Sequence, residues 1–374
     1  MEGKIKLIEI IADSSLGGGP RHVLDLIKNI DKELFDVYVI CPGGYLSAEA
    51  KQIADVTVHN IQMKGKFDLV ALWDIKRTIN IIRAKKDPFG PLIVHTHGSR
   101  AGLLGRLASP LYAKKVYTEH RFDEDFHLKN PINEWVQKKV IQVQNHRSDL
   151  IIAVSRSVRD FLTENNMAPE EKIVVIPNGI DLSAVSKSAN QLSANYKGPI
   201  IGNIGNLNHQ KGQIYLIEAM PFILEKYPLA KLEIIGEGEE RKILEAEILG
   251  LDLAKCVTLC GHKNLIEKYM REWSVFVLPS VAETFGIAVL EAMNAGLPVV
   301  ASRVGGLADI ITQRKNGILV EPRNSKKLAN AILEILDHPV LAAKLKREGL
   351  ARARDFDWKE IIKKIEKEYL SLFK

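Results

Sequence analysis

The sequence predicts an α/β protein with two domains, each built on a parallel β-sheet flanked by helices. The chain has 374 residues, more than one hydrophobic core usually supports, so its length favours two domains. Short β-branched runs alternate with longer stretches of helical periodicity, which is typical of parallel strands joined by helical crossovers. Each half also begins with a strand that leads through a glycine-bearing loop into a helix. We therefore expect two Rossmann-like domains whose sheets face a central cleft, with a ligand at the carboxyl ends of the strands.

The first half of the chain shows the alternation clearly. Its predicted strands are residues 6–11, 37–41, 92–95, 116–118, 149–154 and 173–176. Its predicted helices are residues 21–30, 69–84, 134–147 and 158–165. The alternation stops at Pro177-Asn178-Gly179, a turn signal followed by Ser, Ala and Asn residues without periodicity. We therefore place the first domain at residues 1–177 and a linker at residues 178–198.

A second α/β run follows the linker. Its predicted strands are residues 200–204, 231–235, 257–260, 275–278, 298–301 and 318–320, and its predicted helices are residues 213–226, 239–249 and 325–336. The second domain is predicted to cover residues 199–355. Residues 356–374 carry apolar side chains such as Ile361, Ile365 and Tyr369 at helical spacing, so this last helix is expected to pack back on the first domain.

The bulk composition is that of a soluble globular protein, with 46% hydrophobic and 26% charged residues. The net charge of +6 is small, and the sequence has no nucleic-acid-binding motif, so no nucleic-acid partner is expected. Three cysteines without zinc spacing indicate reduced thiols. No apolar run is long enough to span a bilayer, and the charged N-terminus does not resemble a signal peptide. A cytoplasmic protein is expected.

Positive charge is concentrated in residues 64–115, which contain eleven Lys or Arg against three Asp. Such a patch could hold the protein at the anionic inner face of a membrane. The simpler interpretation is a solvated face over two helices, because the charges are spread along the whole segment. The sequence leaves both interpretations open and favours the second.

Residues 277–310 are the most informative stretch and are predicted to form a strand, a loop, a helix and a second strand. Glu283 lies in the loop, and Gly286 permits a close approach of the backbone. A helix is expected from about Ile287 to Asn294, ended by Gly296. The free amides at its N-terminus favour an anion such as a diphosphate.

Glu283 and Glu291 are eight residues apart. On a helix this spacing corresponds to a rise of about 12 Å, too far for the paired carboxylates of a glycosidase. The two carboxylates are therefore expected to accept hydrogen bonds from different hydroxyl groups of one ligand. The alternative for Glu291 is an ordinary solvated position on the helix.

With this pair, the chain resembles the large family of retaining GT-B glycosyltransferases (family 4, group 1 type), whose signature is Glu, seven residues, Glu. The resemblance covers nearly the whole chain. Single elements are weak signals, but their order and spacing are specific. The further matching elements are Gly17-Gly18-Gly19 before Arg21-His22, Thr118-Glu119-His120, Ala153-Val154-Ser155, Pro177-Asn178-Gly179-Ile180-Asp181, Lys211-Gly212 and Gly305-Gly306.

The resemblance implies a donor site in the second domain and an acceptor site in the first. Glu283 would contact sugar hydroxyls, and Glu291 would hold the ribose. Lys211 would neutralise the diphosphate. Backbone groups of Phe285, Gly286 and Ile287 would contact sugar or phosphate.

In the first domain, the resemblance places His120 over the transferred sugar and the loop Gly17, Gly18 and Gly19 at the phosphate end. His97 and Arg121 would lie on the acceptor side. An ordinary surface or capping role is the alternative for either histidine. The acceptor site would be formed by the predicted loops 43–46, 97–105 and 121–133.

The chain departs from the family pattern at Asn206, in the donor site, where the family usually has an arginine. Lys211, the helix N-terminus and the glycine loop must then stabilise the leaving diphosphate, with Arg303 or His209 as further candidates. No Asp-x-Asp motif is expected to hold a divalent ion at the diphosphate. The nearest acidic cluster, residues 123–125, is interpreted as a solvated or acceptor-facing loop. We predict no cofactor and no metal requirement.

The predicted activity is retaining transfer of a hexose or N-acetylhexosamine from a nucleoside-diphosphate sugar, with a UDP-sugar favoured. The expected acceptor is a glycan or lipid-linked glycan of cell-surface polysaccharide synthesis. A sugar-nucleotide epimerase and a non-catalytic nucleotide-sugar-binding protein of the same fold are the alternatives.

Overall fold

The chain divides into two compact α/β units. The computed structural model describes residues 3–374 apart from residues 16, 86, 121–130, 185–197 and 264, and describes only the backbone of residues 131–137. The first unit contains residues 1–179 and 358–374, and the second contains residues 180–357. Of the predicted linker, residues 185–197 lie outside the described residues. None of the helices in the described ranges combines the length and apolar character that crossing a bilayer requires.

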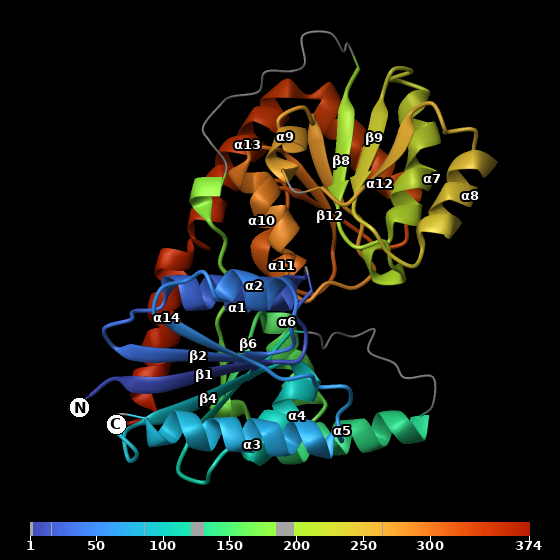
Figure 1. The fold of residues 1–374 in the computed structure, drawn as a ribbon. Coiled ribbons are helices and arrows are strands. Elements are labelled where there is room, and N and C mark those ends of the chain that lie inside the picture. The colour runs from blue at the N-terminus through green and yellow to red at the C-terminus, as the bar shows by residue number, and fades with distance from the viewer. Residues whose placement is uncertain (1–2, 16, 86, 121–130, 185–197, 264) are drawn as a thin grey trace. The chain divides into compact units, whose positions relative to one another are not determined.

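The described part of the first unit contains a parallel sheet of seven strands in the order β3-β2-β1-β4-β5-β6-β7 (Figure 1). The strands are β1 (Ile5–Ile11), β2 (Phe35–Cys41), β3 (Val56–Asn60), β4 (Leu92–His97), β5 (Lys114–Glu119), β6 (Leu150–Ala153) and β7 (Ile173–Val175). All of β1 is buried, as expected for a central parallel strand covered on both faces. Strand order reverses between β1 and β4, and this switch point is where open α/β sheets bind ligands.

Helices cover both faces of the first sheet. They are α1 (Gly18–Asn29), α2 (Tyr45–Ala50), α3 (Leu69–Ala84), α4 (Gly98–Ala108), α5 (Pro131–His146) and α6 (Arg156–Glu164). One face packs on α1, α2 and the C-terminal helix α14 (Trp358–Ser371), and the other packs on α3 and α4 (Figure 1). Side chains along β1 point alternately to the two faces of the sheet. Leu7 therefore packs with α1, α2 and α14, and Ile8 packs with α3 and α4.

The C-terminal helix α14 belongs to the first unit although it follows the second in sequence. It lies beside α1, and its buried residues Trp358, Ile361 and Ile365 join the same core as Val23 of α1. The apolar stripe at helical spacing therefore closes one face of the first sheet.

The described part of the second unit contains a parallel sheet of six strands in the order β10-β9-β8-β11-β12-β13. The strands are β8 (Ile200–Ile204), β9 (Lys231–Ile235), β10 (Val257–Gly261), β11 (Val275–Leu278), β12 (Val299–Ser302) and β13 (Ile318–Val320). Its helices are α7 (Gln213–Leu224), α8 (Arg241–Gly250), α9 (Ile266–Met270), α10 (Ile287–Asn294), α11 (Leu307–Ile310), α12 (Ser325–Asp337) and α13 (Pro339–Arg354). Strand order reverses between β8 and β11. The two parallel sheets confirm the predicted fold class.

One predicted loop is a helix. Residues 97–105 were expected to form an acceptor loop, but α4 begins at Gly98 and runs through this segment. Gly102 and Gly105 lower helix propensity and conceal the helix in the sequence. Packing explains them, because an added Cβ would lie 2.8 Å from the Tyr117 ring at Gly102 and 2.6 Å from Thr96 Cγ2 at Gly105. The predicted loop 43–46 is likewise shortened, since α2 begins at Tyr45.

Candidate functional site

The predicted donor residues of the second unit gather at the switch point of its sheet. The loop that follows β8 carries Lys211, at the end of a short 3₁₀ turn, η3 (His209–Lys211). The loop that follows β11 carries Glu283. Lys211 Nζ donates a hydrogen bond to Glu283 Oε2 at 2.5 Å, although the residues are 72 positions apart. Because β8 and β11 are neighbours, their carboxyl ends bring the two charges together.

Two glycines allow close packing of the loops that carry Lys211 and Glu283. Gly212 follows Lys211 with φ +62°, and an added Cβ would lie 2.4 Å from the carbonyl oxygen of Pro279. Gly286 has φ +105°, and an added Cβ would lie 2.4 Å from Leu307 Cδ2. A side chain at either position would strain the backbone and clash. The sequence signals Lys211-Gly212 and Gly286 therefore have a direct structural cause.

The N-terminus of α10 lies directly after Glu283 and Gly286. Its first amides have no partner within the helix, so they suit an anion. Phe285 is only 2% exposed, and its ring packs against Phe356 with centroids 5.8 Å apart. Phe285 can therefore contact a ligand only through its backbone. The same holds for Gly286, because glycine has no side chain. Ile287 and Glu291 lie on α10 and are partly exposed.

The loop after β8 has no arginine to assist Lys211. Asn206 is exposed, and its carbonyl oxygen accepts a hydrogen bond from Gln213 Nε2 at 3.1 Å. His209 has its Nδ1 atom 3.9 Å from a carboxylate oxygen of Glu240. Lys211 is thus the cation that the described loop places against Glu283. With 25% of its side chain exposed, it can exchange this carboxylate for another anion.

The glycine loop of the first unit follows β1. Gly17 is the N-cap of α1, with an extended backbone, and Gly18 and Gly19 form the first helical turn. An added Cβ would meet nothing within 4 Å at Gly18 and only ordinary contacts at Gly17 and Gly19. Packing against the described residues therefore does not require these glycines, whereas close approach of a ligand would.

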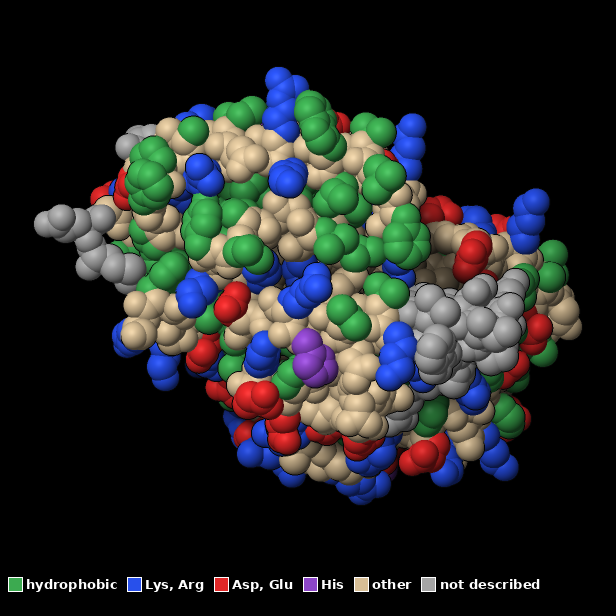
Figure 2. All heavy atoms as spheres, turned by 90° about the horizontal axis from the view of Figure 1, so that it is seen from below, with side chains coloured by type: hydrophobic (Ala, Val, Ile, Leu, Met, Phe, Trp, Pro, Cys, Tyr) green, Lys and Arg blue, Asp and Glu red, His purple; other side chains and the backbone are tan. Residues whose placement is uncertain are grey.

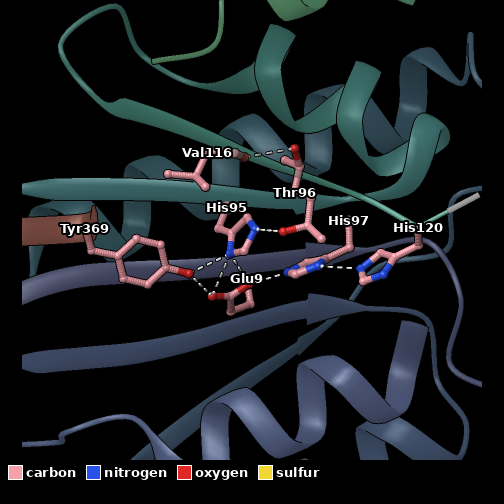
Figure 3. Close-up of polar contacts among 8 residues, drawn as sticks. Glu9, His95, Thr96, His97, Val116, His120 and Tyr369 are labelled. Carbon is pink, nitrogen blue, oxygen red and sulfur yellow. Dashed lines mark hydrogen bonds and ion pairs between the residues drawn. The ribbon is translucent and has the colours of Figure 1, made fainter. Parts of the chain in front are cut away.

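A buried polar network lies beside this loop, on strands β1, β4 and β5 (Figure 3). Glu9 Oε2 lies 2.6 Å from His97 Nε2, and His97 Nδ1 lies 3.2 Å from His120 Nε2. On the other side of Glu9, His95 Nδ1 is 3.2 Å from Oε1 and 2.6 Å from the Tyr369 hydroxyl. Strand register explains the cluster, because Glu9 pairs with His95, so their side chains share one face of the sheet.

Glu9 and His97 both have pKa values below their ordinary ones, for different reasons. Burial alone would raise the pKa of Glu9, but the charge of His95 and hydrogen bonds from His95 and His97 outweigh burial and hold it well below its usual range. Burial lowers the pKa of His97 to about 4, helped by His95 and opposed by Glu9. The site therefore holds an ionised carboxylate beside a neutral His97 at neutral pH.

His22, on α1, adds a further histidine to this cluster. Its ring centroid lies 5.0 Å from that of His120 and 5.6 Å from that of His97. Burial lowers its pKa to about 3, with His97 and His95 adding to the shift and Glu9 and Asn178 opposing it. Among the residues that the structure describes, neither ring nitrogen has a hydrogen-bond partner of ordinary geometry.

The crowded side chains form two groups of possible metal ligands, some of which already make hydrogen bonds. In the described part of the chain, one ligand atom each from His22, His97 and His120 lie within 4.8 Å of one another, as do those of Glu9, His95 and His97. Both nitrogens of His97 already face polar partners, Glu9 and His120. The acidic residues 123–125 and the predicted acceptor residue Arg121 lie outside the described residues.

Sequence reasoning overlooked Glu9, His22 and His95. Glu9 had a signal, because it is a charge inside the otherwise apolar run Ile8 to Ile11, and a buried charge in a central strand needs partners. His22 appears in the sequence only as a neighbour of Arg21 after the glycine loop, and His95 only as the last residue of the predicted strand 92–95. The partners of Glu9 lie far along the chain, at positions such as Tyr369, so the sequence alone could not pair them.

Two family models together match most of the chain. The family model described as Glycosyltransferase Family 4 matches residues 16–184, and the model described as Glycosyl transferases group 1 matches residues 185–352. The UDP-Gal:alpha-D-GlcNAc-diphosphoundecaprenol alpha-1,3-galactosyltransferase of Escherichia coli is 27% identical over 362 residues, covering 90% of this chain and 89% of that protein. The glycogen synthase of Mycobacterium tuberculosis is 32% identical over 287 residues, covering 75% of this chain and 63% of that protein.

The fold is shared with solved structures. Anabaena HepE in complex with UDP-glucose has a TM-score of 0.83 at 22% identity, covering 98% of this chain and 99% of that chain. A sucrose-phosphate synthase from Thermosynechococcus elongatus has a TM-score of 0.82 at 22% identity, with 99% of each chain covered. With family models matched from residue 16 to residue 352, the chain belongs to the GT-B glycosyltransferases of family 4, group 1 type.

Proposed function

We propose that this chain transfers a hexose or N-acetylhexosamine from a nucleoside-diphosphate sugar, with UDP as the favoured nucleotide, and retains the anomeric configuration. The observation that carries the proposal is the Lys211–Glu283 pair beside the N-terminus of α10. A cation, a sugar-hydroxyl acceptor and free amides suit the diphosphate and sugar of one donor. The E. coli relative is named for a UDP-sugar, and HepE binds UDP-glucose.

Donor binding would exchange partners within this pair. Lys211 would leave Glu283 for the diphosphate, and Glu283 would then accept hydrogen bonds from the sugar. Glu291 would accept hydrogen bonds from the ribose, while the amides near Gly286 would contact phosphate. We propose that Lys211 supplies the positive charge that a metal supplies elsewhere, so that no metal is needed.

In the first unit, His120 would contact the transferred sugar and Gly17 to Gly19 would approach the phosphates, as the family resemblance implies. The acceptor hydroxyl would attack from the face that the diphosphate leaves, which retains the configuration. Stabilisation of the departing diphosphate would supply most of the rate enhancement.

The proposed acceptor is a lipid-linked glycan of cell-surface polysaccharide synthesis. The E. coli relative is named for a diphosphoundecaprenol acceptor, and a Staphylococcus aureus relative, 26% identical, for capsular polysaccharide biosynthesis. His97 would lie on the acceptor side. Such an acceptor requires the enzyme to work at a membrane surface.

One surface of the first unit suits that location. Hydrophobic side chains stand exposed on and around α3 and at the end of α4: Phe67, Leu69, Val70, Trp73, Ile81, Leu107, Leu111 and Tyr112. Basic residues are interspersed with them, and Figure 2 shows hydrophobic and basic side chains mixed on this side of the molecule. The Arg77 guanidinium lies 5.5 Å from the Trp73 ring centroid. Exposed aromatic and aliphatic groups among lysines and arginines favour an anionic bilayer surface.

A panel of nucleotide sugars, each with and without a lipid-linked acceptor, tests the proposed activity. Release of the nucleoside diphosphate only when the acceptor is present supports the proposed activity, provided that NMR shows the product to have the same anomeric configuration as the donor sugar. Isomerised donor without acceptor would indicate the epimerase instead, and donor binding without any turnover would indicate a non-catalytic protein. An inverted product would refute the retaining mechanism.

Vesicle sedimentation tests the membrane surface separately. We expect binding to vesicles containing anionic phospholipid to be at least about tenfold tighter than to zwitterionic vesicles, since each basic residue at the surface contributes about 1 kcal/mol. The double variant Val70→Ser/Trp73→Ser should lose this binding. Leu249→Ser is the matched control, because Leu249 is 70% exposed on α8 of the second unit. Equal binding by the double variant would exclude this surface.

A further inference from the structure

Glu9 is a buried charge to which the proposed transfer assigns no role. It lies in the middle of β1, with its side chain fully shielded from solvent. A carboxylate removed from water is retained only where hydrogen bonds and opposite charge compensate it. Its position at the sheet's switch point, two residues from the end of β1, places it next to the loop that carries Gly17.

A chain of hydrogen-bonding groups connects Glu9 to His120. His97 bridges them, with Nε2 at 2.6 Å from Glu9 Oε2 and Nδ1 at 3.2 Å from His120 Nε2 (Figure 3). The rings of His97 and His120 are nearly parallel, with an interplanar angle of 24°. Glu9 and His97 are fully buried, whereas His120 is partly exposed. The chain therefore runs from the interior to the surface residue that we propose contacts the sugar.

The chemistry of the three groups sets the direction of these hydrogen bonds. An ionised carboxylate can only accept, so the hydrogen between Glu9 and His97 is on His97 Nε2. His97 is neutral at neutral pH, because burial lowers its pKa to about 4. A neutral imidazole has one N–H, so His97 Nδ1 carries a lone pair and accepts. His120 must then donate through Nε2.

We propose that Glu9, acting through His97, fixes the tautomer of His120, with hydrogen on Nε2 and a lone pair on Nδ1. In this tautomer His120 contacts a hydroxyl of the transferred sugar. The sugar contact rests on the proposed function, whereas the tautomer does not. Glu9 and His97 are positioning residues in this scheme, since they act on the sugar only through His120.

The opposite side of Glu9 is held by the C-terminal helix. The Tyr369 hydroxyl donates to Glu9 Oε1 at 3.2 Å, and His95 lies between the hydroxyl and Thr118 Oγ1, with Nε2 at 2.7 Å from the latter. Glu9 Oε2 lies 2.6 Å from His97 Nε2 and 3.1 Å from His95 Nδ1, whereas the Tyr369 hydroxyl contacts Oε1. These contacts also supply a matched control, because the Tyr369 hydroxyl touches Oε1 without contacting His97 or His120.

Nitrogen-15 NMR of the histidine rings tests the tautomer directly in the full chain without substrate. His120→Gln assigns the His120 signals by removing them. The expected wild-type result at pH 7.5 is a protonated Nε2 and an unprotonated Nδ1 on His120. The opposite tautomer, or an equal mixture, would overturn the proposal whether or not the chain transfers sugar. If the tautomer is as expected but no nucleotide sugar is turned over, the proposed function fails and the tautomer assignment stands.

Variants then test whether Glu9 is the cause. Glu9→Gln should release His120 into a mixture of tautomers, because an amide can face His97 with either its oxygen or its NH₂ group. The kcat should fall on the order of 10- to 100-fold, the loss typical of one charge-assisted hydrogen bond, with the donor KM within about threefold. Glu9→Gln/His97→Asn should lose no more kcat than His97→Asn alone, because linked residues are not additive.

Tyr369→Phe, the control, should keep the wild-type tautomer and a kcat within about threefold of wild type. A single wild-type tautomer in Glu9→Gln, or additive losses in the double variant, would refute the assignment of Glu9 as the positioning group. The wild-type NMR result decides the tautomer even if Glu9→Gln fails to fold.

Discussion

Lowering the pH from 7 to 5 should destabilise the first unit by about 4 kcal/mol, because this unit buries two neutral histidines. Burial lowers the pKa of His22 to about 3 and that of His97 to about 4, from an ordinary value of 6.5. Because the folded values lie below the unfolded value, the unfolded chain binds protons first as the pH falls through 6.5, and stability is lost. Each histidine loses about 2 kcal/mol over this interval. Glu9 adds little above pH 5, because an unfolded carboxyl titrates near 4.5.

Urea unfolding followed by hydrogen exchange of peptides from β1 and β4 measures this effect in the first unit alone. His22→Phe is the informative variant, because it removes one titrating group and replaces a buried ring by an apolar ring of similar shape. In His22→Phe, the free energy of unfolding of the first unit should fall by only about 2 kcal/mol between pH 7 and pH 5, the contribution of His97. A wild-type loss below about 1 kcal/mol, or an unchanged loss in His22→Phe, would refute the argument.

Three further predictions concern the second unit and its chemistry. Lys211→Ala should lower kcat/KM on the order of 10²- to 10³-fold, as removal of one preorganised charge-stabilising group does. Lys226→Ala, the control, removes a lysine that pairs with Asp337 at the surface and should change kcat/KM little. Near-normal turnover of Lys211→Ala would show that another group supplies the positive charge. Gly202→Ala should destabilise the second unit by about 1–3 kcal/mol in urea unfolding, because its Cβ would lie 1.9 Å from the Trp273 ring, whereas Gly250→Ala, with nothing within 4 Å, should not. Turnover should persist after treatment with EDTA and dialysis, and loss of activity restored by a divalent cation would contradict metal independence.

The fold class followed from local sequence signals. Buried parallel strands read as short β-branched runs, and the helices between them show a period of 3.6 residues. Prediction failed where tertiary packing overrode local preference. The helix α4 contains Gly102 and Gly105, which a helix disfavours, because Tyr117 and Thr96 leave no room for a side chain. The strand β3 (Val56–Asn60) was missed because it is a short, half-exposed edge strand with a weak apolar pattern.

The sequence predicted residues of the candidate site but not which of them contact one another. Glu283, Glu291 and Gly286 stood out because a glycine turn at a helix start is a local feature that sequence spacing reveals. The contact of Lys211 with Glu283 joins loops 72 positions apart. It exists because β8 and β11 are neighbours in the sheet, which is a property of strand order.

The sequence by itself determined the α/β architecture, the glycine loops and the types of residue available to hold a sugar nucleotide. Only the tertiary structure decided which charges meet. Glu9 is a single acidic residue in an apolar strand, and its partners come from β4 and from α14 at the far end of the chain. Hydrophobic periodicity is a property of residues that are close together in the sequence. Compensation of a buried charge depends instead on strand register and helix packing, which bring residues that are distant in the sequence within hydrogen-bonding distance.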